Sequence, residues 1–571
     1  MRASKAPPID AAHWRLAVLL ALATVAFMLA LAPATMLWDR DEALYARTAV
    51  EMLRSGDFLL PTFNGATFAH KPPLIYWLMA GSLSVFGHGE FAVRLPSALG
   101  LAGAAFFTFL AGARLFGARA GLWAMTFLVI STMAVYLGSA AMLDAVLLLF
   151  VCAATWSFVE LLYRPDRLLP LATIFGAALA LAQLTKGPVG PAVVVGTVLL
   201  TTLLLPKAQR PTLRSLAALA VSAIVSFAVF LAWAIPANTA SGGALLGTGI
   251  GIHVIGRALA PMEGHGGSGV GGYLATLPVY VPVILIAIFP WILHFPATVS
   301  ALLRREIGTA RERAILWGWA APTFVMFSLA ATKLPHYIFP LMPAVMLAIA
   351  ATVDSRLEGG LETASRWWLR AGAWIYGVSA LAMLVAVVAA LLMLREPVAI
   401  TISVVFGVVC LAAAAIAVVR AQLREQVDLS GIILAIAMPF AYGLLFWLLV
   451  PTVEPEIKIS RAVADEIRST VPAGTPTFMT GYTEPSLVFY LDPPVGEVIA
   501  TLPGDPAEAA AKLAAAPDFV LVATEERLEA IAAAPGAPGF DVRWRRSAIN
   551  LNAGADRQTV VIARRGLAPG G

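Results

Sequence analysis

The chain has 571 residues, of which 60% are hydrophobic and only 13% are charged, and its mean hydropathy is +0.83. Soluble globular domains carry about a quarter charged residues, so this composition excludes an ordinary soluble protein and indicates a polytopic membrane protein. The formal net charge is +5, but no basic stretch is interleaved with aromatic residues, and nucleic acid is not an expected partner. Both cysteines, Cys152 and Cys410, lie in apolar runs, so neither disulfides nor a thiolate metal site is expected.

Apolar runs long enough to cross a bilayer recur along the first 453 residues. A spanning helix needs roughly 20 apolar residues. About thirteen segments meet this requirement: 14–33, 91–113, 120–139, 142–162, 168–184, 188–206, 215–237, 276–301, 314–331, 334–353, 367–394, 397–419 and 429–451. The first run is longer than the apolar core of a signal peptide, so we expect it to remain as a helix.

Lysine and arginine gather in every second junction between these runs, as in "RPDR", "KAQRPTLR" and "RREIGTARER". The positive-inside rule assigns such loops to the cytoplasm. We therefore expect the N-terminus to be cytoplasmic. An odd number of spans then places the chain after residue 453 on the outer side of the membrane.

The composition becomes polar after residue 453. The runs "PTFMTGY", "LVFYL", "DFVLVAT" and "TVVIARR" predict strands, and "DPAEAAAKL" predicts a helix. The predicted organisation is thus a transmembrane domain over 1–453 and a soluble α/β domain over 454–571. A first outer loop over 36–90 carries juxtamembrane helices.

This first outer loop concentrates charge. Asp39 and Glu42 have the spacing of a capping box, and they precede an apolar stripe that predicts a helix on the membrane surface: Ala43, Ala46, Val50 and Leu53. A second amphipathic element is expected over Pro72–Phe86. Asp41 and Glu42 either belong to a functional site or only favour the positive end of that first helix.

Charges near the outer ends of spans are candidates for function because burying a charge in a membrane is unfavourable. Asp144 either caps an apolar span or belongs to a site. Lys186 and Lys333 either reach the head groups by snorkelling or bind phosphate. Three histidines fall on outer loops, where they could bind zinc or serve as polar loop residues: His70, His253 and His265.

Several motifs together resemble one family. The stretch "DEALYARTAVEMLRSGDFLLPTFNGATFAHKPPLIYWL", followed by "AMLDAV", "LTKGPVG", "GIHVIGRALAPMEGHGG" and "TKLPHYIFPLMPAV", resembles the lipid A aminoarabinose transferases and their protein O-mannosyltransferase relatives. These are GT-C glycosyltransferases, which use polyprenyl-phosphate sugars as donors and act at the outer face of the membrane that they span. The likeness covers roughly the first 350 residues and is architectural beyond them, with an α-helical GT-C fold and an outer soluble domain.

The resemblance implies roles for individual residues. The catalytic group is Asp41 with Glu42 and Asp144. The residues that contact the donor phosphate are Lys71, Lys333, Arg257, Tyr45 and Tyr337. Those at positions of a metal site, which zinc could occupy, are His70, His253 and His265. His70 replaces the acidic residue of the family's "EKP" motif, and Leu44 replaces a basic residue. These departures leave the phosphate clamp and the aminoarabinose substrate open.

The expected activity is inverting transfer of a sugar from a polyprenyl-phosphate donor to a lipid, glycan or protein acceptor. Cations would meet the charge that develops on the phosphate, and Asp41 would accept the acceptor's proton. No nucleotide cofactor is expected, because no Gly-rich phosphate loop is found. The alternatives are a transporter or flippase for lipid-linked sugars and a non-catalytic scaffold. The sequence does not identify the sugar, the prenyl chain length or the acceptor.

Overall fold

The structure is a computed structural model that describes residues 9–38, 41–262, 266–267, 269–358, 363–394, 398–472, 474–494, 496–550 and 556–566. Within it the chain forms two compact units. Unit 1 contains residues 1–32, 69–78 and 94–445, and unit 2 contains residues 33–68, 79–93 and 446–571. Unit 2 is therefore assembled from three separate stretches, and the first outer loop contributes to it together with the C-terminal region.

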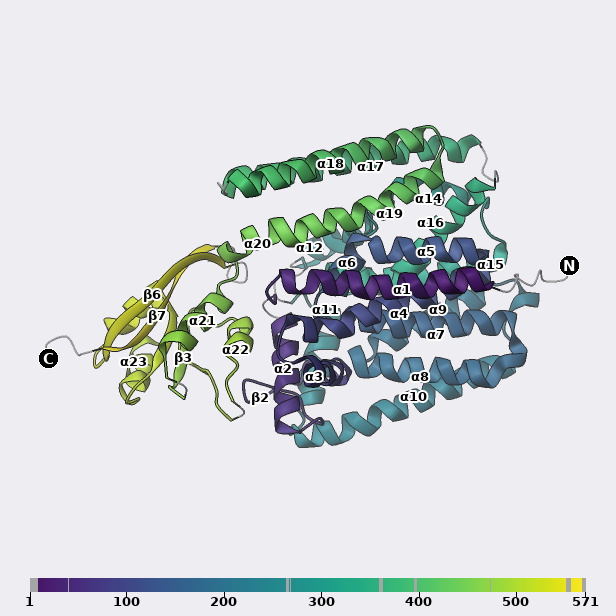
Figure 1. Ribbon diagram of the computed structural model, residues 1–571. Coiled ribbons are helices and arrows are strands. Elements are labelled where there is room, and N and C mark those ends of the chain that lie inside the picture. Colours follow the sequence, from purple (N-terminus) through teal and green to yellow (C-terminus); the bar gives the residue numbers. More distant parts are fainter. Residues whose placement is uncertain are drawn as a thin grey trace. The chain divides into compact units, whose positions relative to one another are not determined.

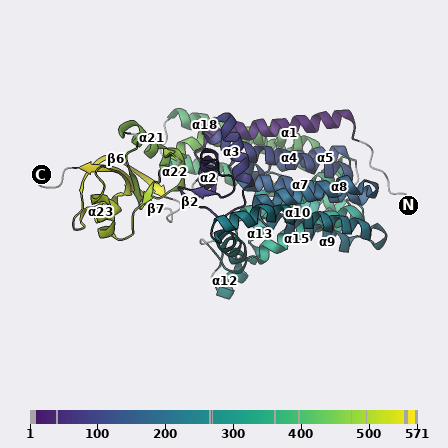
Figure 2. The same cartoon turned by 90° about the horizontal axis from the view of Figure 1, so that it is seen from below.

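Unit 1 is a helical bundle whose long helices α1, α4, α7, α8 and α10 run roughly parallel in both views (Figures 1 and 2). Its helices are α1 (Ala11–Leu31), α4 (Glu90–Phe116, which begins in unit 2), α5 (Ala118–Ile130), α6 (Thr132–Ser139), α7 (Leu143–Tyr163), α8 (Leu168–Lys186), α9 (Val189–Leu204), α10 (Leu213–Ala240), α11 (Arg257–Leu259), α12 (Gly269–Thr276), α13 (Tyr280–Ala287), α14 (Phe295–Leu303), α15 (Ala310–Leu329), α16 (Met342–Leu357), α17 (Thr363–Leu394), α18 (Val398–Leu423) and α19 (Val427–Leu444). Short irregular helices join them: the π-helix η4 (Leu245–Gly256) and the 3-10 helices η2 (Pro165–Arg167), η3 (Lys207–Gln209), η5 (Leu277–Val279), η6 (Trp291–Leu293) and η7 (Pro335–Leu341), with η1 (Ala32–Ala34) at the boundary with unit 2.

The expected multi-pass membrane protein is confirmed. In the described parts of the chain nine helices are long and apolar enough to cross a membrane, or ten if the bent pair α5–α6 is one span. Ten of the thirteen predicted segments correspond to these. The segments at α9, α15 and α18 stay predictions. The predicted span 276–301 is wrong in its bounds, because the candidate span runs over Gly269–Ala287 and the chain then turns through η6.

One buried cluster of unit 1 lies between α7, α8 and α9. Phe158 of α7 and Phe175 of α8 are nearly fully buried in one cluster with Val194 of α9. Apolar residues thus cover these helices on most sides, as is typical of the interior of a membrane bundle, where small residues and close packing hold helices together. This packed group supports the ends of α7 and α8 where Asp144 and Lys186 lie.

Unit 2 has a five-stranded mixed sheet with the order β4-β3-β5-β7-β6. The strands are β3 (Thr477–Thr480), β4 (Ala500–Thr501), β5 (Val520–Thr524), β6 (Gly539–Asn550) and β7 (Asp556–Gly566), and a small hairpin is formed by β1 (Thr62–Phe63) and β2 (Ala66–Thr67). The helices are α2 (Asp41–Ser55), α3 (Leu74–Phe86, which begins in unit 1), α21 (Ser460–Thr470), α22 (Pro485–Leu491), α23 (Pro506–Ala514) and α24 (Glu525–Ala532), with α20 (Val450–Val453), η8 (Leu445–Leu449) and η9 (Glu454–Glu456) leading in. The predicted C-terminal α/β fold is confirmed, although the domain boundary at 453/454 stays a prediction.

One predicted strand is wrong. The run "LVFYL" belongs to α22, which begins with Pro485 at its first helical position, where the missing N–H costs nothing. Its residues Ser486–Tyr490 are all buried. A short run that is apolar on all sides does not show a helical or a strand period, and its type cannot be determined from the sequence.

The helix predicted in the first outer loop is present as α2. Ala43, Ala46 and Val50 of its apolar stripe are buried and Leu53 is half-buried. Glu42, Arg47 and Glu51 are buried as well. Arg47 pairs with Glu51 at 2.8 Å and with Asp492 at 3.1 Å, and it donates to the carbonyl of Pro493 at 2.9 Å. This helix is therefore embedded in protein within unit 2. Its polar face carries buried ion pairs, and its position on the membrane surface stays a prediction.

Candidate functional site

Unit 1 contains a cavity of about 890 Å³. It is formed by the loop 69–72, α8, α10, η4, α15 and η7. The polar residues that line it are His70, Lys71, Gln183, Lys186, Asn238, Thr239, His253, Arg257 and Tyr337. Much of the remaining lining is apolar, with Phe227, Phe230, Leu231, Trp233, Ile250 and Phe327 among it. A cavity with clustered cations and a broad apolar lining suits an amphipathic anion.

Lys71 lies in the turn between β2 and α3. Pro72 and Pro73 follow it, and the carbonyl of Pro73 accepts the first bond of α3 from the Trp77 N–H at 3.0 Å. The neighbouring element η4 approaches this turn closely, because a Cβ on Gly249 would lie only 2.7 Å from the carbonyl oxygen of Ala69. Proline stiffness on one side and the glycine on the other therefore fix the direction of the turn that carries His70 and Lys71.

His70 and His253 are adjacent, with ring centroids 4.2 Å apart. Burial, followed by the positive charges of His70, Lys71 and Arg257, lowers the pKa of His253 to about 3. Its buried Nδ1 has no hydrogen-bond partner in the described part of the chain. Two adjacent imidazoles fit two ligands of a zinc ion. The third predicted ligand, His265, lies outside the described residues, and no group of three such ligands occurs among the residues that the structure describes.

Asp144 and Lys186 form an ion pair of 2.6 Å. Asp144 is in the first turn of α7 and Lys186 is in the last turn of α8. A carboxylate at a helix N-terminus and an ammonium at a helix C-terminus are each stabilised by the helix dipoles. The Asp144 carboxylate is buried and Lys186 is nearly so, which fixes the ammonium at the wall of the cavity.

Arg257 and Tyr337 are also joined. The guanidinium Nη1 of Arg257 donates to the Tyr337 hydroxyl at 3.0 Å, and the Lys186 ammonium lies 5.2 Å from the centre of the Tyr337 ring. Backbone hydrogen bonds from Ala331 N to Ala258 O and from Thr332 N to Arg257 O, both 3.0 Å, tie the two chain segments together. Lys186, Arg257 and Tyr337 are therefore one connected group.

Lys333 lies just after α15. Its ammonium donates to the carbonyls of Phe327, Ser328 and Ala330, at and just beyond the end of α15, and burial lowers its pKa. The last carbonyls of a helix lack helical partners, and a nearby lysine can satisfy them. Lys333 is not among the described residues that line the cavity, and its contact with the donor phosphate stays a prediction.

The acidic pair of the first outer loop lies in unit 2. Glu42 is almost completely buried, and its carboxylate accepts from the backbone N–H of Trp38 at 2.9 Å. The hydroxyl of Tyr45 donates to Asp41 at 3.0 Å. Asp41 is exposed, whereas Glu42 is buried and its carboxylate is hydrogen-bonded at the start of α2. Asp39, the predicted partner in the capping box, lies outside the described residues.

The predicted site residues thus fall into two groups. In unit 1 the cavity brings together His70, Lys71, His253, Arg257 and Tyr337, and Asp144 pairs with Lys186 in its wall. Unit 2 holds Asp41, Glu42 and Tyr45. Sequence reasoning left Lys186 with two interpretations and did not pair it with Asp144. Its position directly before Gly187, at the end of an apolar run, marks a helix end but does not identify the partner on another helix.

Part of this chain is similar in sequence to known proteins. Residues 70–235 match the family described as dolichyl-phosphate-mannose-protein mannosyltransferase. The undecaprenyl phosphate-alpha-4-amino-4-deoxy-L-arabinose arabinosyl transferase of Shewanella sediminis is 30% identical over 333 residues, which are 56% of this chain and 57% of that protein. The enzyme of the same name from Edwardsiella ictaluri is 29% identical over 345 residues, 60% of this chain and 59% of that protein. The matches thus span somewhat more than half the length of these relatives.

The similarity in fold covers more of the chain than the similarity in sequence. The crystal structure of ArnT from Cupriavidus metallidurans bound to undecaprenyl phosphate matches with a TM-score of 0.75 at 21% identity, over 97% of this chain and 98% of that chain. Its apo state matches with a TM-score of 0.73. The expected GT-C architecture, with a C-terminal soluble domain, is confirmed. This chain is a multi-pass membrane protein that resembles the aminoarabinose transferases in sequence and has the GT-C fold of ArnT along nearly its whole length.

Proposed function

We propose that this protein is a glycosyltransferase that moves a sugar from a polyprenyl-phosphate donor to a lipid, glycan or protein acceptor at the outer face of the bacterial inner membrane. The observation that carries the proposal is the cavity in unit 1, where Lys71, Lys186 and Arg257 share one chamber with a broad apolar lining. A phosphate attached to a long prenyl chain has these two properties in one molecule. The names of the relatives and of the bound ArnT structure point to the same donor class.

The chemistry requires stabilisation of a leaving phosphate. When the bond between the sugar and the phosphate oxygen breaks, negative charge grows on that oxygen, and fixed cations lower the barrier. Lys71 and Arg257 supply charge from the cavity wall, and Tyr337 orients Arg257 through its hydroxyl. Lys186 is held by Asp144, so Asp144 acts through this lysine.

The acceptor hydroxyl needs a base. Asp41 is our choice because it is exposed, whereas Glu42 is buried and already accepts the Trp38 N–H. Tyr45 orients the Asp41 carboxylate. A direct attack would invert the anomeric centre. If zinc is bound, His70 and His253 would hold it, and it would supply a further positive charge for polarising an oxygen ligand.

The proposal places the N-terminus in the cytoplasm and residues 454–571 in the periplasm, following the alternation of cations between the spans. The acceptor and the sugar are left open within the stated classes.

Mass spectrometry of lipids, glycans and envelope proteins tests the activity. Cells with the gene should contain a glycosylated product that is missing both from cells without it and from cells that express only Lys71→Ala. A protein that only moved the lipid-linked sugar across the membrane would instead change the distribution of the donor, and no product would form from donor and acceptor with the purified enzyme. That result would overturn the proposal.

A further inference from the structure

The residues that precede α2 are held by side chains from the C-terminal part of unit 2. Glu454 accepts from the backbone N–H of Met36 at 2.8 Å, and the Lys458 ammonium donates to the backbone carbonyl of the same residue at 2.8 Å. The next N–H along the chain, that of Leu37, donates to the Tyr490 hydroxyl at 2.8 Å. Three consecutive polar groups of an irregular segment are therefore bound by three side chains.

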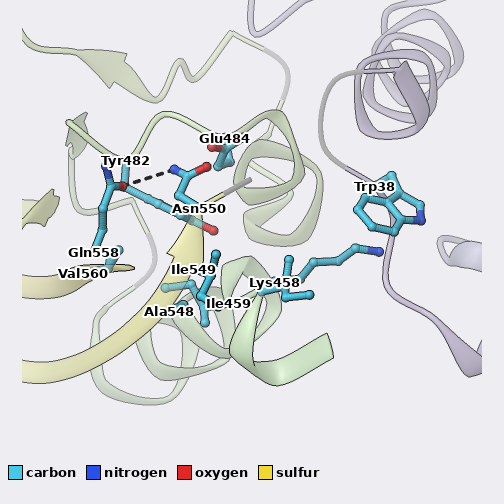
Figure 3. Close-up of a pocket in the computed structure, with 11 residues that line it drawn as sticks. Trp38, Lys458, Ile459, Tyr482, Glu484, Ala548, Ile549, Asn550, Gln558 and Val560 are labelled. Atoms are coloured by element: carbon cyan, nitrogen blue, oxygen red, sulfur yellow. Dashed lines mark hydrogen bonds between the residues drawn. The ribbon is translucent and has the colours of Figure 1, made fainter. Parts of the chain in front are cut away.

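These three side chains are themselves fixed. Glu454, Lys458 and Tyr490 are only 6–7% exposed. Lys458 pairs with Glu454 at 2.9 Å, and its ammonium lies 4.0 Å from the centre of the Trp38 ring. Figure 3 shows the extended Lys458 side chain pointing at that ring, beside a small pocket whose lining includes Glu484 and Asn550. The Tyr490 hydroxyl in turn donates to Glu90 at 2.8 Å, and Glu90 also pairs with Arg461.

The held segment leads directly into the acidic pair. The N–H of Trp38 donates to the Glu42 carboxylate at 2.9 Å, and its carbonyl accepts from Ala43 N at 3.2 Å. Both ends of the Trp38 residue are thus bonded to the first turn of α2, the turn that contains Asp41. A displacement of residues 36–38 would move this turn with them.

We propose that Glu454, Lys458 and Tyr490 are positioning residues for Asp41, so that the C-terminal domain takes part in the reaction by fixing the start of α2. The inference rests on the proposed function, because it assigns the base to Asp41. The competing explanation is that the three side chains only stabilise the packing of unit 2. The two explanations differ in what they predict for variants of equal stability.

Tyr490→Phe is the most conservative test, since it keeps the ring and removes the hydroxyl. The matched control is Tyr482→Phe, because Tyr482 is buried in the same domain and its hydroxyl hydrogen-bonds Ser460 at 2.7 Å. If the hydroxyl of Tyr490 positions the base, Tyr490→Phe should lower kcat by about tenfold to a hundredfold. Tyr482→Phe should lower it by less than about twofold, even where the two variants lose the same thermal stability.

Lys458 supplies the second comparison. Lys458→Met keeps an aliphatic side chain of similar length but loses the ammonium that donates to Met36 and lies over the Trp38 ring, whereas Lys458→Arg keeps a charged donor. We expect kcat to fall in Lys458→Met and to recover largely in Lys458→Arg. Glu456→Gln, which breaks the exposed pair of Glu456 with Arg557 two residues away from Glu454, is the neutral control.

All variants are measured as full chains in detergent or nanodiscs, with binding of undecaprenyl phosphate as a separate readout. Positioning predicts a fall in kcat while the affinity for undecaprenyl phosphate stays within about twofold, because Asp41 serves the acceptor. The proposal is overturned if Tyr490→Phe turns over normally, or if it and Tyr482→Phe lose kcat in proportion to their loss of stability. Failure of the proposed function would look different, since the wild-type protein itself would then form no product.

Discussion

The Lys186 ammonium lies 2.6 Å from the Asp144 carboxylate and joins the last turn of α8 to the first turn of α7. Removing one member of a buried ion pair leaves an uncompensated charge and typically costs about 3–5 kcal/mol, whereas replacing both costs much less. We therefore expect Asp144→Asn or Lys186→Met alone to unfold at clearly lower temperature than the double variant. Thermal unfolding in detergent measures this.

The same variants separate a structural pair from a functional one. If Lys186 contacts the donor, the double variant should be stable yet bind undecaprenyl phosphate at least about tenfold more weakly. Normal binding by the stable double variant would limit the pair to holding α7 against α8.

Lys71 should be needed for the donor. Lys71→Ala and Lys71→Gln remove a charge from the cavity and should weaken undecaprenyl phosphate binding severely, whereas Lys71→Arg should retain part of it because the charge is kept with a different geometry. Binding titrations measure the effect. The matched control is Lys333→Met, which removes an equal charge bound to carbonyls near the end of α15 and should lower stability without changing donor affinity. Equal donor affinity in Lys71→Gln and the wild type would exclude the phosphate contact.

Asp41→Asn should abolish turnover, by a factor of about 100 or more, while the protein stays folded, because the amide cannot accept the acceptor's proton. Tyr45→Phe should cause a smaller loss, since the Tyr45 hydroxyl only orients the Asp41 carboxylate. Glu42→Gln should lower stability and should also lower kcat, less than Asp41→Asn does, because it weakens the bond to the Trp38 N–H. Near-normal kcat in purified Asp41→Asn would show that the base is another group.

The histidines should bind a metal. Elemental analysis of purified protein should find about one zinc per chain, and the His253→Ala and His265→Ala variants should lose it. His13→Gln is the control, because His13 is paired with Asp10 at the start of α1. If active wild-type enzyme contains no metal and chelators do not change its rate, His70 and His253 are polar contacts only.

The orientation in the membrane is tested with reporters. A periplasmic reporter fused after Gly571 should be active, and a cytoplasmic one should not, because the cations alternate over an odd number of spans. The opposite result would mean that one span was assigned wrongly, with α9, α15 and α18 the first to re-examine.

Local signals in the sequence predicted local structure well. The helix α2 was predicted from its acidic start and apolar stripe, and both are observed. The helix α23 and the strand β5 follow the predicted order because Asp505 caps the helix and Val520–Thr524 is a buried run that alternates β-branched residues with Leu and Ala. The assignment failed at "LVFYL", where burial on all sides leaves no period to read.

Pairing between distant residues was not predictable. Asp144 and Lys186 are 42 positions apart and meet because α7 and α8 pack side by side. In the sequence Lys333 looks like Lys186, because both are lysines at the end of an apolar run. The Lys333 ammonium nevertheless donates to a carbonyl of the preceding helix, α15. Which lysine faces a cavity depends on the direction of each helix end, and one sequence does not specify that direction. The grouping of residues 33–68 with 446–571 depends on contacts of the same long-range kind.

Unit 2 is assembled from stretches far apart in the chain, and Arg47 shows what this means for biogenesis. It is buried to 1% exposure and bonded to Asp492, 445 positions further along the chain. During synthesis, which adds about 5–20 residues per second, α2 is complete long before the residues that cover Arg47 exist. While most of the spans are being inserted, the Arg47 side chain and apolar residues of α2 therefore remain without the C-terminal residues that bury them in the finished protein. A nascent chain arrested before residue 454 should accordingly carry a protease-sensitive loop that becomes resistant only when translation finishes.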